Sequence, residues 1–197
     1  QVLRLGTACI AAQGLWDVAR PHLAALVRHT GESSSMSQLD GSDIVYTARV
    51  PVAKIIALSV HIGTRFPATS TSMGMVMLAD LSTSQLDRAL KIAPTSTVVP
   101  RVQLTRKQID ISLAKIRKQG WALSDETLSF GIRSVAAPVR NAQGQTIAAI
   151  NVTVNAAETS VKTLTEKYLP LLLKTASNIT QDFVSFGLLP TTEPLSK

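Results

Sequence analysis

The sequence is poor in the residues that cross-link a protein or anchor it to a membrane. Cys9 is the single cysteine among 197 residues, so no disulfide forms within the chain, and a lone thiol is typical of a reducing compartment. No uninterrupted apolar run approaches the roughly 18 residues of a membrane-spanning helix, so we expect no membrane partner. Because the chain begins at Gln1 without a secretory cleavage pattern, we interpret it as part of a longer, cytoplasmic protein.

Aromatic residues make up 4% of the chain and charged residues 17%, and both low values exclude classes of protein. Few aromatic rings argue against a platform that stacks nucleic-acid bases. A hydrophobic content of 45% with so little charge excludes global disorder. The net charge of +7 favours anionic partners, but the densest basic cluster, at residues 106–118, is better explained as the solvated face of one predicted helix.

Signatures of catalysis are missing as well. The sequence contains no GxSxG, HExxH or CxxC motif and no glycine-rich phosphate loop. The histidines His22, His29 and His61 have no cysteine or carboxylate at metal-ligand spacing. The adjacent carboxylates Asp125 and Glu126 fit a charged turn better than an acid–base pair. We therefore predict no catalytic residue, no metal and no cofactor.

Apolar spacing and turn residues predict the elements of the first half of the chain. Helical periodicity covers residues 15–29, and Pro21 is tolerated only in a first turn, so we expect this helix to begin at about Asp17. Strands of an antiparallel meander are predicted at 33–39, 44–50 and 55–62, before a loop at 63–67.

Serine and threonine residues mark the starts of further helices. The small hydroxyl residues at 68–74 precede an apolar run at 75–79, and they either only cap this helix or also leave free N–H groups for an anion. Capping boxes begin two more helices, at Ser82 and at Thr105. The second of these helices is expected to stop at Gly120.

Strands return in the second half of the chain. Apolar runs at residues 132–139 and 146–154 flank a turn at 141–144. A last helix is predicted at 159–186, kinked or split at Pro170, because proline costs about 3 kcal/mol inside a regular helix. Helices segregated around a mainly antiparallel sheet predict an α+β fold.

Small polar side chains interrupt the last two strands at Ser134, Asn151 and Thr153. Asn151 and Thr153 are two residues apart, so they point to the same face of a sheet. A buried polar atom without a partner costs about 1–3 kcal/mol. We therefore expect this polar row either to meet a small polar ligand or to form hydrogen bonds within itself.

Arg133 lies within the first of these strands, where arginine is rarely buried without a partner. An ion pair with Asp125 or Glu126 explains it better than contact with a ligand carboxylate. We therefore expect Arg133 to position a loop beside the polar row rather than to hold a ligand.

Motifs with a common order are spread along the chain: residues 66–74 (FPATSTSMG), 120–126 (GWALSDE), 131–139 (GIRSVAAPV), Gly144 and 148–152 (AAINV). Together they resemble the effector-binding domain of the IclR family of bacterial transcriptional regulators. The details resemble in particular the subgroup that controls aromatic catabolism through protocatechuate and β-ketoadipate, at 32–35 (ESSS), 39–41 (LDG), 48–51 (ARVP), 63–67 (GTRFP) and 71–74 (TSMG).

The resemblance implies a GAF-like fold, in which a central antiparallel sheet carries helices on its faces and closes over a small ligand. The domain is expected at residues 15–190, after the end of an interdomain linker helix at 1–14 and before a C-terminal tail at 191–197. The family's winged helix-turn-helix is absent from this chain, so operator DNA is a partner only through that missing domain. A dimer or tetramer is also implied.

A ligand pocket follows from the resemblance, residue by residue. Some family members have Asp in place of Ser124, Cys in place of Ser134, and Ser in place of Asn151 and Thr153, which leaves the identity of the ligand open. The implied ligand-binding residues are Ile55, Leu58, Ser72, Met73, Gly74, Ser124, Ser134, Asn151 and Thr153, with Asp125 and Arg133 in support.

These residues predict an effector-sensing domain that binds a small carboxylate and couples it to DNA binding. The N–H groups near Met73 and Gly74 would hold the carboxylate, and Ile55 and Leu58 would cover its apolar part. Protocatechuate, 4-hydroxybenzoate and β-ketoadipate are the expected effectors. The alternatives are an enzyme that acts on a small acid and a purely structural oligomerisation module.

Overall fold

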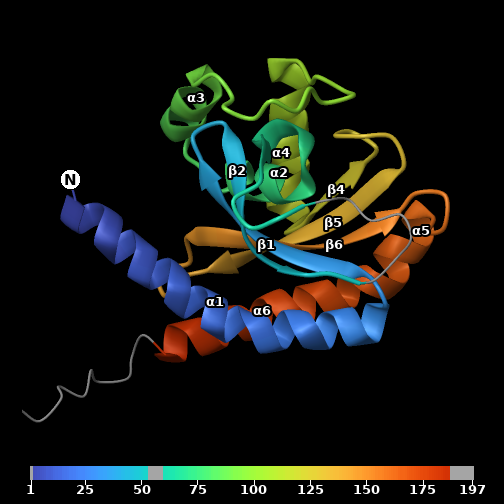
Figure 1. Ribbon diagram of the computed structural model, residues 1–197. Coiled ribbons are helices and arrows are strands. Elements are labelled where there is room, and N and C mark those ends of the chain that lie inside the picture. Colours follow the sequence, from blue (N-terminus) through green and yellow to red (C-terminus); the bar gives the residue numbers. More distant parts are fainter. Residues whose placement is uncertain (1, 53–59, 187–197) are drawn as a thin grey trace, which may run out of the picture.

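A curled antiparallel sheet forms the centre of the computed structural model, which describes residues 2–52 and 60–186 (Figure 1). Within these residues the sheet has six strands in the order β3-β2-β1-β6-β5-β4. The strands are β1 (Ser33–Asp40), β2 (Asp43–Val50), β3 (Arg65–Pro67), β4 (Ala122–Asp125), β5 (Ile132–Arg140) and β6 (Thr146–Asn155).

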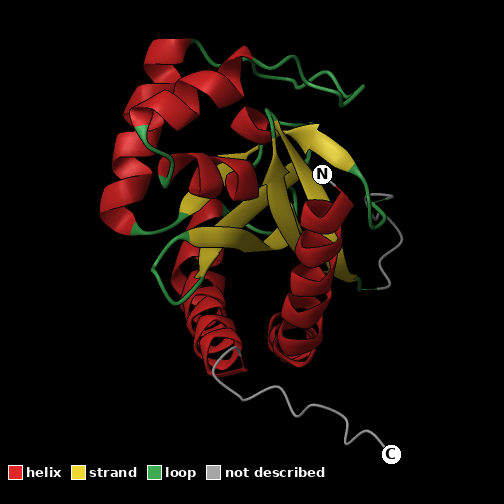
Figure 2. Ribbon diagram, turned by 90° about the vertical axis from the view of Figure 1, so that its left-hand side faces the viewer, coloured by secondary structure: helices red, strands yellow, loops and turns green. Residues whose placement is uncertain are grey.

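Helices cover both faces of this sheet. Two long helices lie against one face and a group of shorter helices covers the other (Figure 2). The long helices are α1 (Val2–Thr30) and α6 (Leu169–Phe186), and the shorter ones are α2 (Ser72–Ala79), α3 (Thr83–Lys91) and α4 (Arg106–Gln119). The predicted α+β fold with an antiparallel sheet is confirmed.

The alternation of side chains along β5 and β6 separates two hydrophobic cores. Val135 and Ile150 are fully buried on the side of α1 and α6. Their neighbours Ala136 and Ala149 point the other way, into the core beneath α2. Because successive strand residues face opposite sides, one pair of strands serves both layers. The small alanine side chains allow α2 to pack closely on the centre of the sheet.

Helix α1 begins at Val2, so the predicted start at Asp17 is wrong, and Pro21 lies inside the helix. Proline removes one backbone hydrogen bond and crowds the preceding turn. The buried side chains of Leu15, Ala19 and Leu23 recur at helical spacing on both sides of Pro21. Their packing against the sheet holds the backbone helical across the proline.

Proline is accommodated differently in the last helix. Residues Val161–Thr163 (α5), Leu164–Tyr168 and α6 follow one another without a loop, and the middle segment is a π-helix. The N–H of Leu169 there donates to the carbonyl of Leu164, five residues back. This wider turn immediately precedes Pro170, whose missing N–H would have interrupted a regular ladder. The predicted irregularity at Pro170 is therefore a change in hydrogen bonding rather than a split.

The predicted loop at residues 63–67 is wrong in part, because Arg65–Pro67 forms the edge strand β3. It pairs with β2 from Asp43 to Val45. Phe66 is buried there, with its ring edge-on to Tyr46 at a centroid distance of 5.6 Å. A segment of three residues that ends in proline is too short to show the alternation of a strand in its sequence. Its pairing with β2 is what identifies it as a strand. Most of the predicted strand at 55–62 lies outside the described residues.

The predicted caps are present. Ser82 and Thr105 begin α3 and α4 with reciprocal capping boxes, and Gly120 ends α4 at φ 81°. Thr71 caps α2, since its Oγ1 accepts from the N–H of Gly74 at 3.1 Å. All residues of α2 are buried. These local hydrogen bonds place the first turn of α2 over the polar row of β5 and β6.

Candidate functional site

A cavity of about 30 Å³ lies between the start of α2 and the polar row on the sheet. Of the nine predicted ligand-binding residues, its walls bring together Ser72, Met73, Ser124, Ser134, Asn151 and Thr153. We call this space the inner cavity. Ile55 and Leu58 lie outside the described residues. Gly74 does not line the cavity.

The first turn of α2 is occupied by its own cap. The N–H of Gly74 is bonded to Thr71 Oγ1, so it is not available to a ligand. A Cβ on Gly74 would lie 2.1 Å from the carbonyl oxygen of Ala68, so glycine is needed because the backbone of Ala68–Ser70 passes close to the helix. The backbone N–H groups of Ser72 and Met73 are the donors of this turn that have no partner among the described residues.

The polar row forms hydrogen bonds within the protein. Asn151 Oδ1 accepts from the N–H of Ser35 at 3.0 Å, and Asn151 Nδ2 donates to Thr153 Oγ1 at 2.9 Å. The hydroxyls of Ser72 and Ser134 lie 2.7 Å apart, which joins α2 to β5. Asn151 is thus held rigidly with its amide over the sheet. The predicted arrangement of Asn151 and Thr153 on one face is present.

Two residues that the sequence interpretation missed, Tyr46 and Arg49, also line the inner cavity from β2. They are three positions apart and would face opposite sides of a regular strand. The register of β1 against β2 shifts where Met36 pairs with Ala48 and Ser37 pairs with Tyr46, which leaves Thr47 as a bulge. This extra residue turns both side chains to the same face. Strand periodicity alone therefore does not reveal them.

The electrostatics of the inner cavity depend on this pair. Among the described residues that line the inner cavity, Arg49 alone is charged. Its Nη1 donates to Ser35 Oγ at 3.2 Å. Burial lowers the pKa of Arg49, but a guanidinium starts so high that it stays protonated. Burial raises the pKa of Tyr46 to about 12, so its hydroxyl stays neutral. A fixed cation beside a neutral hydroxyl and helix N–H groups suits an anion.

Arg133 lies outside this cavity. Its Nε donates to Asp125 Oδ1 at 2.6 Å, and its Nη1 donates to the carbonyl of Thr159 at 2.6 Å. These bonds join β4, β5 and the turn that precedes α5. The ion pair within the protein is the interpretation that the sequence favoured.

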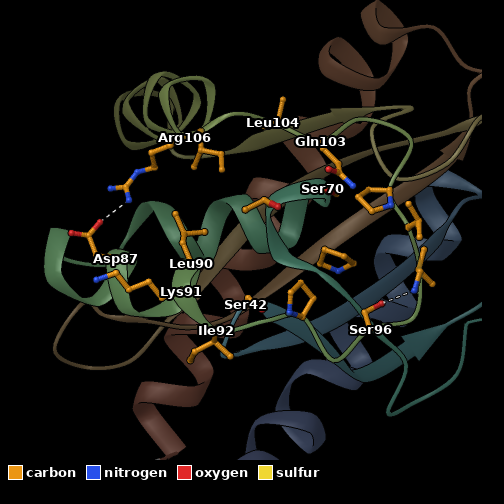
Figure 3. Close-up of a pocket in the computed structure, with 17 residues that line it drawn as sticks. Ser42, Ser70, Asp87, Leu90, Lys91, Ile92, Ser96, Gln103, Leu104 and Arg106 are labelled. Atoms are coloured by element: carbon orange, nitrogen blue, oxygen red, sulfur yellow. Dashed lines mark hydrogen bonds and ion pairs between the residues drawn. The ribbon is translucent and has the colours of Figure 1, made fainter.

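A much larger hollow than the inner cavity lies elsewhere, as an open groove of about 990 Å³ between α3, the start of α4 and residues 92–104 (Figure 3). Asp87 of α3 and Arg106 of α4 form an ion pair of 2.7 Å at one end of it. None of the predicted ligand-binding residues that the structure describes lines this groove. A third hollow, of about 300 Å³, separates α4 from β4. Ser70 belongs to the walls of all three.

The part of the chain that the structure describes offers neither a metal site nor a membrane-spanning helix. No group of three or more His, Cys, Asp or Glu side chains could hold a metal ion there. No described helix has the length and hydrophobicity to cross a membrane.

Sequence comparison assigns this arrangement to a class of protein. Residues 7–181 match the family of bacterial transcriptional regulators described as IclR C-terminal, and the chain belongs to that family. Members and relatives are transcriptional regulators rather than enzymes, so the alternative of a small-acid enzyme is wrong.

Individual relatives are regulators of aromatic catabolism. The Pca regulon regulatory protein of Pseudomonas putida is 32% identical over 180 residues, which cover 91% of this chain and 62% of that protein. The p-hydroxybenzoate hydroxylase transcriptional activator of Acinetobacter baylyi is 31% identical over 189 residues, covering 91% and 68%. The chain therefore spans about 62% of the length of the first of these relatives.

Solved structures agree with the fold. A transcriptional regulator from Rhodococcus sp. RHA1 superposes with a TM-score of 0.83 at 41% identity, covering 94% of this chain and 76% of that one. The inducer-binding domain of a PobR double mutant from Acinetobacter, in complex with 3-hydroxybenzoic acid, gives 0.74 at 30% identity, covering 83% and 96%. The IclR protein of Thermotoga maritima gives 0.77. The chain is an effector-binding domain of the IclR family with its GAF-like fold.

Proposed function

We propose that this domain senses a small aromatic carboxylate in the inner cavity and transmits its binding to a DNA-binding domain elsewhere in the protein. The observation that carries the proposal is the convergence of Arg49, Tyr46 and the first turn of α2 above the polar row. Relatives that regulate the Pca regulon and p-hydroxybenzoate hydroxylase support an aromatic acid as effector.

The charge distribution favours an anion. The described wall of the inner cavity carries the guanidinium of Arg49 and no carboxylate. Ser72 and Met73 add the free N–H groups of a helix N-terminus, where the helix dipole also attracts negative charge. The carboxylate of the effector would lie between these groups and replace part of the solvation that it loses. Charge-assisted hydrogen bonds of this kind contribute about 1.5–3 kcal/mol each.

The remaining walls suit a hydroxylated ring. Phe66, Met73 and Ile132 supply apolar surface, whereas Ser134 and Thr153 supply hydroxyl groups at the sheet. Protocatechuate, 4-hydroxybenzoate and 3-hydroxybenzoate combine a carboxylate with ring hydroxyls. β-Ketoadipate replaces the ring by a short chain and a second carboxylate. Because the described cavity holds one cation, we place the aromatic monocarboxylates before it.

The size of the inner cavity supports a coupling mechanism. A volume of about 30 Å³ has room for one water molecule, whereas a cavity that holds benzene is about 150 Å³. An aromatic effector would therefore have to separate α2 from the sheet or displace another wall. A ligand that binds one arrangement better than another shifts the population toward it. This displacement is what a DNA-binding domain would detect.

The partners follow from the family. We infer that the domain works as a dimer or tetramer in the bacterial cytoplasm, where its DNA is. Operator DNA is contacted through a separate winged helix-turn-helix domain, in agreement with relatives that are longer than this chain.

A thermal-shift screen of this chain tests the proposal. We expect 4-hydroxybenzoate, protocatechuate or 3-hydroxybenzoate to raise the melting temperature, and 4-hydroxybenzyl alcohol, which lacks the carboxylate, to leave it unchanged. Arg49→Met should weaken binding by about tenfold or more, the loss of one charge-assisted hydrogen bond. Arg88→Met, which removes an exposed arginine on α3, is the matched control. If no aromatic or dicarboxylic acid raises the melting temperature, the proposal is wrong.

A further inference from the structure

A second cavity, distinct from the inner one, lies on the outer side of β4. Its volume is about 300 Å³, ten times that of the inner cavity, and it is bounded by α4, β4 and the residues that precede α2. Small-molecule sites commonly begin at about this size. We call this space the outer cavity.

The charge of the outer cavity is one-sided. Among the described residues that line the outer cavity, Lys115 of α4 alone is charged, and none carries a carboxylate. Within the described part of the chain the ammonium of Lys115 forms no ion pair. Arg106, on the same helix, is instead held by both Asp87 and Asp110. A small anion in the outer cavity would thus meet a free cation and no repulsion.

The rest of the wall combines a large ring with hydroxyl groups. Trp121 lines the cavity and is half-buried, because it also packs against the core on the side of α1 and α6. Around it are hydroxyl side chains, including Ser70, Ser112 and Ser124. Aromatic pairs contribute about 0.5–1.5 kcal/mol beyond the area they bury. A cation at one side, an indole and several hydroxyls match a hydroxylated aromatic acid.

We infer that the outer cavity is a second binding site, for a small aromatic carboxylate, with Lys115 as its cation and Trp121 as its ring partner. The inference does not depend on which ligand occupies the inner cavity, because the two cations lie in different walls.

A shared wall connects the two cavities. Ser70, Thr71 and Ser124 line both, and Ser124 Oγ donates to the carbonyl of Ser70 at 3.5 Å between them. This hydrogen bond is long, so its strength is low. A ligand in the outer cavity that draws Ser124 or Thr71 outward changes the wall of the inner cavity. Binding at one site therefore alters affinity at the other, and by thermodynamic linkage the effect is reciprocal.

The two tryptophans of the chain, Trp16 and Trp121, allow a direct test by NMR. Titration of this chain with 4-hydroxybenzoate should shift the indole N–H signal of Trp121 saturably and leave that of Trp16 on α1 unchanged. Lys115→Met should raise the concentration for half-maximal shift by about tenfold, which corresponds to about 1.4 kcal/mol. Lys118→Met, one turn further along α4 and exposed, should change it by less than twofold.

Two further variants separate this inference from the proposed function. Ser112→Leu fills the outer cavity without removing a charge, and it should abolish the Trp121 shift. Arg49→Met acts on the inner cavity, and it should leave the Trp121 shift in place. The inference is overturned if Trp121 does not respond to millimolar 4-hydroxybenzoate. A response that Lys115→Met and Ser112→Leu leave unchanged, or that Arg49→Met abolishes, overturns it as well.

Discussion

The two faces of the sheet bury different kinds of side chain. On the side of α1 and α6, β5 and β6 present Val135, Ala137, Ile150 and Val152, all fully buried and apolar. On the side of α2 the same strands present Ser134, Asn151 and Thr153 among alanines. The inner cavity, the open groove and the hollow between α4 and β4 all reach this second side, where Ser70 lines each of them.

The contrast separates a face that is packed for stability from the face to which we assign the proposed binding. Apolar side chains of the first face can adapt their packing to the long helices, because hydrophobic contacts have no fixed direction. Polar side chains of the second face are held by the directions of their hydrogen bonds, so they cannot close every gap. Cavities therefore remain where the polar row meets α2. Substitutions on the first face should change stability alone, whereas those on the second should change binding too.

The largest effect is expected on the apolar face. Ile150→Ala removes a fully buried side chain and should lower the free energy of unfolding by about 2–5 kcal/mol, through lost transfer energy and the cavity left behind. Urea unfolding measures this cost. The affinity of the folded protein for 4-hydroxybenzoate should change less than twofold. A strong loss of affinity would show that the two faces are not independent.

The adjacent position tests the polar face. Asn151→Leu keeps the size of the side chain but leaves the N–H of Ser35 and the hydroxyl of Thr153 without their partner. We expect a loss of about 1–3 kcal/mol in unfolding free energy and loss of the thermal shift by effectors. Ile150→Ala is the control, because it lies one residue away and faces the opposite side. An intact effector response in Asn151→Leu would favour a purely structural role for the polar row.

Asp43 tests the charge-dependent support of the second face, where it holds residues 95–96 beside the open groove. Burial opposes ionisation of Asp43, but hydrogen bonds from Thr95, Ser96 and Arg65 outweigh it, so the pKa of Asp43 is lowered. A lowered folded-state pKa stabilises the protein above the unfolded-state value of about 3.9. The stabilisation is lost as the pH falls through the folded-state pKa.

Asp43→Asn should therefore cost about 1–2 kcal/mol at neutral pH, because it replaces charge-assisted hydrogen bonds by neutral ones. The difference between variant and parent should shrink as the pH falls from about 3.9 through the lowered folded-state pKa of Asp43, below which the parent carboxylate is protonated in the folded protein too. Urea unfolding at neutral pH and at a pH below the folded-state pKa of Asp43 measures this difference in stability. A difference that does not depend on pH would mean that the geometry of Asp43 matters and its charge does not.

The smallest expected effect distinguishes two helix caps. Thr71→Val and Thr105→Val each remove a side chain that caps a helix, α2 and α4 respectively, and each should cost about 1 kcal/mol. Thr71→Val alone should weaken effector binding, because the first turn of α2 lines the inner cavity. Chemical unfolding and the thermal-shift assay, applied to both variants, separate the two effects. Equal binding in both would remove the first turn of α2 from the proposed site.

The sequence interpretation succeeded where the cause is local. A capping box needs two residues three apart, as in Ser82 and Gln85, and its hydrogen bonds form within one turn. Asn151 and Thr153 share a face because a strand repeats every two residues. The interpretation failed at β3 and at the start of α1, where distant packing decides. Neither Phe66 nor Pro21 reveals from its neighbours that buried contacts elsewhere will hold its backbone.

The candidate site divides in the same way. By itself the sequence determined the α+β class, the caps and the common face of Asn151 and Thr153, because short-range hydrogen bonds and strand alternation depend only on neighbouring residues. Only the tertiary structure placed Arg49 beside Tyr46, because a bulge depends on the register of the partner strand. It also decided that Ser70 borders all three hollows, because that residue lies where separate elements meet.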